Sequence, residues 1–138
     1  MTDANSTAKT YALVLGVVLL LVGILGFVPV LNPNNNELGI FAINGLHNVI
    51  HILTGVVGIA AATSAGGLYA RWFAGIFGAV YALVTVVGFV QGNTVLGLIP
   101  ANTADNLLHT AITLSALGVF FGTRSPVRST VQATANRF

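Results

Sequence analysis

Two rows of polar side chains hold the residues of this chain that could bind a metal ion or transfer a proton. The first row is Asn44, His47, Asn48 and His51, and the second is Asn102, Asp105, Asn106 and His109. Each row follows the spacing i, i+3, i+4 and i+7, which places its members on one face of a helix over about two turns. Apolar residues follow both rows. The pattern therefore predicts two apolar helices whose first turns carry imidazole, amide and carboxylate groups.

Metal or haem binding is one interpretation of these rows. His47 and His51 lie one helical turn apart and can chelate one ion, and His109 with Asp105 would complete a set of three nitrogens and one oxygen. Such a set suits zinc, copper or iron, with His47, His51 and His109 as the metal ligands. As an alternative, His51 and His109 could hold haem b between two helices.

Other interpretations need no cofactor. Asn is a favoured N-cap, so Asn44 and Asn102 are predicted to cap the two helices. The deeper polar residues could form an interhelical hydrogen-bond network, which stabilises membrane helices by roughly 0.6–2 kcal/mol per bond; these residues are Asn48, Asn106, His51 and His109. A third interpretation pairs His47 with Asp105 as a proton relay or pH sensor.

The composition indicates a membrane protein. Of the 138 residues, 55% are hydrophobic and only 6% are charged, whereas a soluble domain usually carries about 25% charged residues. A single transmembrane domain covering residues 1–138 is expected, with the lipid bilayer as its main partner. Four stretches are long and apolar enough to cross the membrane, at about residues 10–31, 46–62, 72–90 and 104–121.

The charges predict the orientation. With four spans, the five basic residues fall on one side of the membrane; they are Lys9, Arg71, Arg124, Arg128 and Arg137. Glu37 and Asp105 fall on the other side. The positive-inside rule then places both termini in the cytoplasm. The polar rows lie at the outer ends of the second and fourth spans, and the predicted location is the plasma (inner) membrane of a bacterium.

The two halves of the chain resemble each other. Asn44, Asn48 and His51 match Asn102, Asn106 and His109 at equal spacing, and the glycines and valines of the first span match those of the third. Two tandem two-span repeats are therefore predicted, related by a pseudo-two-fold axis along the membrane normal. The axis would bring the polar faces of the second and fourth spans together. His47 opposite Asp105 is the one mismatch within the polar rows.

The polar residues also resemble those of a known family. The pattern Asn44-x-x-His47-Asn48-x-x-His51 and the run from Leu98 to His109 are similar to a family of small bacterial four-span proteins catalogued as domain of unknown function 4383. The resemblance covers roughly residues 11–121. It implies a four-helix integral membrane protein, and it implies no reaction, substrate or cofactor.

The sequence therefore predicts an all-α, integral membrane four-helix bundle. Cys is absent, no nucleophile–base set or phosphate-binding loop is recognisable, and the basic residues form no nucleic-acid patch, so we expect neither an enzyme nor a nucleic-acid partner. The leading functional prediction is a structural or accessory subunit of a membrane complex without a cofactor, associating with other membrane subunits or with itself. The alternatives are a haem- or metal-binding protein and a proton-relay or pH-sensing protein.

Overall fold

Four long helices dominate the computed structural model, which describes residues 4–34, 36–123 and 135. They are α1 (Ala4–Leu25), α2 (Gly45–Thr63), α3 (Ala70–Gln91) and α4 (Thr103–Gly122). Each is long and apolar enough to cross a membrane, which confirms the predicted all-α, four-span fold. A 3-10 turn, η1 (Ser64–Gly67), connects α2 to α3.

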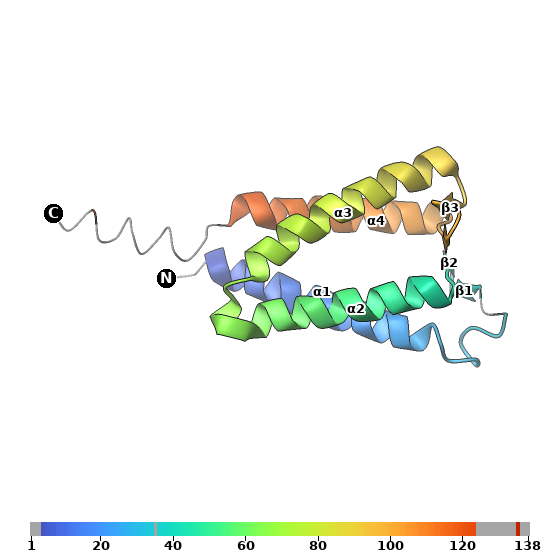
Figure 1. Cartoon of the computed structure of the whole chain (residues 1–138), viewed down its shortest axis with the longest axis horizontal. Helices are drawn as coiled ribbons and strands as arrows, with labels where there is room; N and C mark the ends of the chain where they lie inside the picture. Colours follow the sequence, from blue (N-terminus) through green and yellow to red (C-terminus); the bar gives the residue numbers. More distant parts are fainter. Residues whose placement is uncertain (1–3, 35, 124–134, 136–138) are drawn as a thin grey trace.

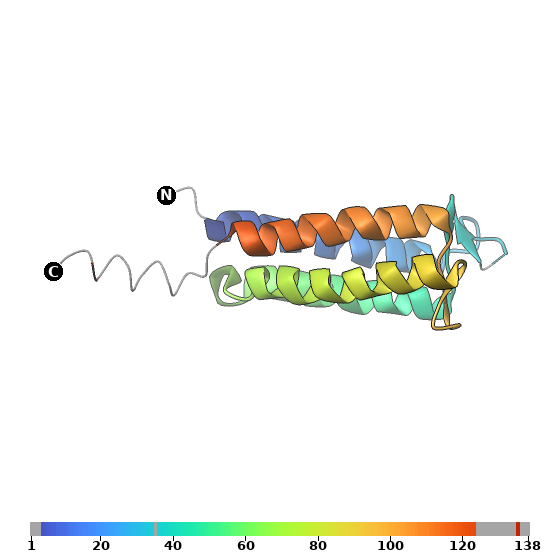
Figure 2. The same ribbon diagram turned by 90° about the horizontal axis from the view of Figure 1, so that it is seen from above.

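The helices pack as two antiparallel pairs. Helix α1 lies mainly against α2, and α3 lies mainly against α4 (Figures 1 and 2). A short β-hairpin joins the helices of each pair; the strands are β1 (Glu37–Leu38), β2 (Phe41–Ala42), β3 (Thr94–Val95) and β4 (Ile99–Pro100). Both hairpins lie at one end of the bundle, here called the hairpin end. The start of α1 and the end of α4 lie at the opposite, terminal end (Figure 1).

The first helix begins and ends earlier than the predicted span at residues 10–31. It ends at Leu25, and the chain then turns, with Asn32 Nδ2 donating to the carbonyl of Gly26 at 2.9 Å. Pro29 prevents the helix from continuing, because it has no N–H to donate to the carbonyl of Leu25 and it disfavours the helical conformation of Val28. The short apolar stretch at residues 38–43 forms the first β-hairpin.

Close backbone contact holds α1 against α2. A Cβ added to Gly55 would lie 2.5 Å from the backbone nitrogen of Leu20 and 2.7 Å from the carbonyl oxygen of Gly16. Only glycine leaves room for the two backbones at this distance, as in other membrane helix pairs that use small residues at the crossing.

An aromatic row along α3 fills the centre of the bundle. The ring centroids of Phe73 and Phe77 are 5.2 Å apart, and those of Phe77 and Tyr81 are 4.2 Å apart. All three side chains are buried. Many apolar side chains on the outer helix faces are exposed instead, as expected where lipid is the surrounding solvent.

Candidate metal centre at the hairpin end

Asparagine caps fix the starts of α2 and α4 at the hairpin end. The side-chain oxygen of Asn44 accepts a hydrogen bond from His47 N at 2.8 Å. Asn102 accepts from Asp105 N at 3.0 Å, and Asp105 Oδ2 accepts from Asn102 N at 2.9 Å, which completes a capping box. The structure thus places both asparagines at the predicted N-caps.

The same two asparagines connect the two halves of the bundle. Asn44 Nδ2 donates to the carbonyl of Leu98 at 2.8 Å, and Asn102 Nδ2 donates to the carbonyl of Ile40 at 2.8 Å. Each cap therefore holds the hairpin of the opposite half. This exchange fixes the first turns of α2 and α4 relative to each other, and these turns carry the histidines.

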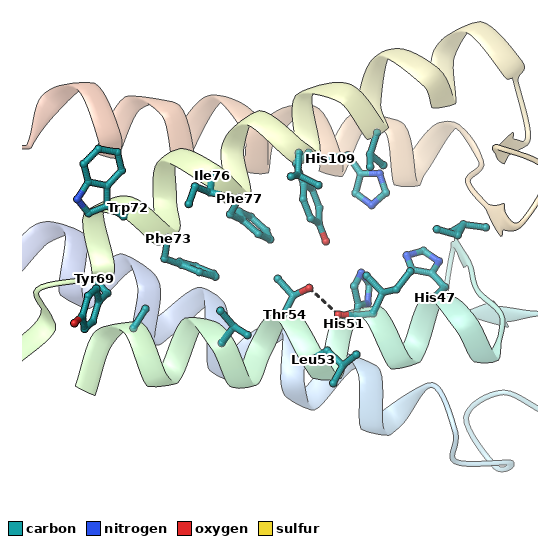
Figure 3. A pocket seen from close by; sticks show the side chains of 17 residues that line it. His47, His51, Leu53, Thr54, Tyr69, Trp72, Phe73, Ile76, Phe77 and His109 are labelled. Atoms are coloured by element: carbon teal, nitrogen blue, oxygen red, sulfur yellow. Dashed lines mark hydrogen bonds between the residues drawn. The ribbon is translucent and has the colours of Figure 1, made fainter. Parts of the chain in front are cut away.

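Three histidines meet just below the hairpins. His47 and His51 come from α2 and His109 comes from α4 (Figure 3). One ring nitrogen of each lies within 4.8 Å of the corresponding nitrogens of the other two. The side chains are 4%, 9% and 4% exposed, respectively. Among the described residues, this is the group of ligand atoms close enough to hold one metal ion.

The hydrogen bonds around these rings leave nitrogen lone pairs uncommitted. His47 Nδ1 lies 3.1 Å from the carbonyl oxygen of Ala42. A carbonyl can only accept, so Nδ1 carries the hydrogen and Nε2 keeps its lone pair. The Nδ1 atoms of His51 and His109 are buried without a hydrogen-bond partner among the described residues. A buried polar atom left unpaired costs about 1–3 kcal/mol, a cost that a cation bound at that nitrogen would remove.

Asp105 supports this site from outside it. Its Oδ2 also accepts from Ala42 N at 3.0 Å, and the carbonyl of Ala42 holds His47. Asp105 is not a member of the converging ligand group, in contrast to the predicted set of three nitrogens and one oxygen. The two backbone N–H groups bonded to Oδ2 hold the carboxylate against the first hairpin and the start of α4. The predicted His47–Asp105 proton pair stays a prediction; no hydrogen bond joins the two side chains in the described part of the chain, and both contact Ala42.

Asn48 and Asn106 lie in separate interfaces. The amide of Asn48 packs against Gly26 at the end of α1, and the amide of Asn106 packs against Gly88 of α3. Both amides are buried. His47 and Asn48 are neighbours in sequence, so their side chains point about 100° apart around α2. The predicted six-residue cluster therefore divides into a three-histidine site, two asparagine contacts within the helix pairs, and Asp105, which bonds to the backbone beside the site.

A groove between α2 and α3 reaches the histidines from the side of the bundle. Its volume is about 640 Å³, and its lining includes all three histidines at one end and Tyr69 and Trp72 at the other (Figure 3). No sequence pattern considered above predicts this groove. The sequence does contain one feature that indicates a wall of the groove. Phe73, Phe77 and Tyr81 are spaced at i, i+4 and i+8, which places three aromatic side chains on one helix face.

The geometry favours a single ion over a haem. His47 and His51 have ring centroids 4.5 Å apart, and those of His47 and His109 are 6.2 Å apart. A porphyrin held between His51 and His109 would need room for its ring beside His47, whose ring centroid lies 4.5 Å from that of His51.

Comparison with known proteins identifies one family. The model of the family described as Domain of unknown function (DUF4383) matches residues 9–122, a range that contains the three histidines and nearly all of the helical bundle. No curated protein and no solved structure matches the chain.

Proposed function

We propose that this chain, which belongs to the DUF4383 family and has four membrane-spanning helices, binds a transition-metal ion through His47, His51 and His109. One observation carries the proposal: three imidazole nitrogens lie within 4.8 Å of one another in a buried site. Four imidazole or carboxylate groups are not needed, because sites with three protein ligands keep a fourth position for water or another ligand.

Zn²⁺ and Cu²⁺ fit this donor set best. Both bind imidazole strongly, and hard cations such as Mg²⁺ and Ca²⁺ prefer oxygen ligands. With metal–nitrogen bonds of about 2.0–2.1 Å, tetrahedral ligands lie about 3.3 Å apart. The observed separations reach 4.8 Å, so binding would draw the rings together by up to about 1.5 Å, a shift that side-chain rotation can supply.

The surrounding contacts have the form of an outer ligand shell. A metal-binding histidine usually donates its second ring N–H to a carbonyl or carboxylate, which fixes its orientation. His47 donates Nδ1–H to the carbonyl of Ala42 at 3.1 Å. Ala42 is held in turn by Asp105 at 3.0 Å. His47 is thereby presented with Nε2 free, in the tautomer that a metal requires.

The charged residues support a location in a bacterial inner membrane with both ends of the chain in the cytoplasm. Lys9 and Arg71 lie at the starts of α1 and α3, at the terminal end. Glu37 and Asp105 lie at the hairpin end. The positive-inside rule then assigns the terminal end to the cytoplasm and the metal site to the outer face.

Matching contacts in the two halves support an origin by internal duplication. The Gly26–Asn48 contact of the first pair recurs as Gly88–Asn106 in the second. Each half also has a helix, a two-stranded hairpin and an asparagine-capped helix. The role of a structural or accessory subunit, non-enzymatic and associated with other membrane subunits, stays a prediction, and a metal centre is compatible with it.

Metal analysis of the purified protein tests the proposal. The full chain carries three histidines, so it would be purified in mild detergent with a tag free of histidine, equilibrated with Zn²⁺ or Cu²⁺ and analysed for bound metal. We expect one ion per chain, and we expect His51→Gln and His109→Gln to lose it. Thr113→Val, a buried polar change on α4 just beyond His109, should retain it. Folded wild-type protein without stoichiometric metal would contradict the proposal.

A further inference from the structure

The groove between α2 and α3 opens to the lipid along most of its length. Several of its lining side chains are largely exposed on the outer face of the bundle, among them Leu53 at 60%, Val57 at 58% and Ile76 at 64%. The lining extends from His47 to Ala61 along α2, a distance of about 21 Å at the helical rise per residue. A molecule dissolved in the bilayer can therefore enter sideways and lie along the helices.

Polar and apolar chemistry is separated along this groove. The three histidines form one end, and apolar or aromatic side chains form most of the rest (Figure 3). Within the described chain, no Asp, Glu, Lys or Arg lines it. The proposed metal ion at the histidine end would therefore be the one strong polar contact for the head of a ligand. The groove fits a long apolar molecule whose head carries an oxygen that can reach this ion.

Aromatic rings lead to the polar end. The row formed by Phe73, Phe77 and Tyr81 continues to His109, whose ring centroid lies 5.2 Å from that of Tyr81 in an edge-to-face arrangement. All four residues line the groove. Such a wall favours a planar ring as the head of the ligand, because aromatic rings pack well in offset or edge-to-face contacts.

We infer that this groove binds a lipid-soluble quinone, with its tail along α2 and α3 and a ring oxygen at the open position of the metal held by the three histidines. The inference rests on the proposed metal site and names its ligand. A three-histidine site leaves one position open, and the histidines themselves line the groove. A metal ion there would act as a Lewis acid toward an oxygen of the quinone ring.

Cobalt-loaded protein gives a direct test, because the visible bands of Co²⁺ respond to a change of its ligands. The full chain in detergent micelles would be loaded with Co²⁺ and titrated with decylubiquinone. We expect a saturable change in the Co²⁺ spectrum. A quinone without a tail should bind more weakly, and decane should leave the spectrum unchanged.

Two neighbouring residues supply a matched pair of variants. Val57 lines the groove and is 58% exposed, whereas Val56 is 50% exposed and lies outside the lining. Val57→Trp should fill the groove and weaken quinone binding at least tenfold, and Val56→Trp should bind as the wild type does. Val80→Trp, on the opposite wall and 53% exposed, should repeat the effect of Val57→Trp. Circular dichroism would verify that each variant is folded.

The outcomes separate the two proposals. If Co²⁺ binds at one ion per chain but decylubiquinone leaves its spectrum unchanged, the quinone inference is wrong and the metal site stands. Equal affinity in the Val57→Trp and Val56→Trp variants would also overturn the inference. If folded protein binds no Co²⁺, both the metal site and the quinone inference fail.

Discussion

Replacing Asp105 with alanine tests whether the hairpin end holds His47 in its metal-binding orientation. Asp105 Oδ2 accepts hydrogen bonds from Ala42 N at 3.0 Å and from Asn102 N at 2.9 Å. The carbonyl of the same Ala42 orients His47. Asp105→Ala removes the carboxylate without touching any of the three ligands, so a change in metal affinity would act through the hairpin, through the start of α4 or through the lost negative charge.

The expected loss of stability in Asp105→Ala follows from the two hydrogen bonds that Asp105 Oδ2 accepts. Loss of the capping-box contact costs about 1 kcal/mol. Loss of the charge-assisted bond from Ala42 N costs about 1.5–3 kcal/mol, since Asp105 is only 3% exposed. We expect the free energy of unfolding to fall by about 2.5–4 kcal/mol. Outer-shell changes typically weaken metal binding 10–100-fold, and we expect Zn²⁺ affinity to fall in that range.

Two control variants separate orientation from general destabilisation. Asp105→Asn keeps an oxygen that can accept both N–H groups, so it should retain most of the Zn²⁺ affinity. Asn102→Ala removes the cap and the bond to Ile40 but leaves the Asp105–Ala42 bond, so it should lower stability and weaken Zn²⁺ binding less than Asp105→Ala does. Thermal unfolding in detergent and competition with a chromogenic chelator measure the two quantities. Wild-type Zn²⁺ affinity in folded Asp105→Ala would refute the reasoning.

Two further predictions concern helix packing and orientation. Gly55→Leu should lower the free energy of unfolding by about 1–3 kcal/mol, because the added Cβ would lie only 2.5 Å from Leu20 N. Gly118→Leu is the control: no atom lies within 4 Å of its added Cβ, so the melting temperature should stay nearly unchanged. The chain lacks cysteine, so an impermeant maleimide should label Asn93→Cys at the hairpin end in intact cells and should not label Ser64→Cys at the terminal end; the reverse pattern would invert the proposed orientation.

The parts of the fold that depend on local chemistry could be predicted from the sequence. Four helices follow from the length and hydropathy of four stretches, and the structure contains them. The N-caps at Asn44 and Asn102 follow from the preference of asparagine for that position, and both caps are present. The helical spacing also put His47 and His51 on one face of α2.

The rest depends on how helices pack, which the sequence pattern does not specify. Helical periodicity identified a polar face, but α2 buries two faces, and His47 and its neighbour Asn48 lie on different ones. Gly26 leaves room for the amide of Asn48, and Gly88 leaves room for the amide of Asn106. Each asparagine therefore points into its own helix pair. The two-residue strands of each hairpin are too short to give an alternating pattern. The groove exists because α2 and α3 contact each other only slightly.

The proposed metal site depends on the one position at which the two polar rows differ, His47 in the first row and Asp105 in the second. His47 and Asp105 occupy corresponding positions, and both contact Ala42: its carbonyl accepts from His47 Nδ1, and its N–H donates to Asp105 Oδ2. Aspartate at both positions would remove the third imidazole. Histidine at both would remove the carboxylate that accepts from Ala42 and completes the capping box. In the proposed duplication, the matched residues His51 and His109 supply two of the ligands. The mismatched pair supplies the third ligand, His47, and the carboxylate of Asp105, which helps to orient it.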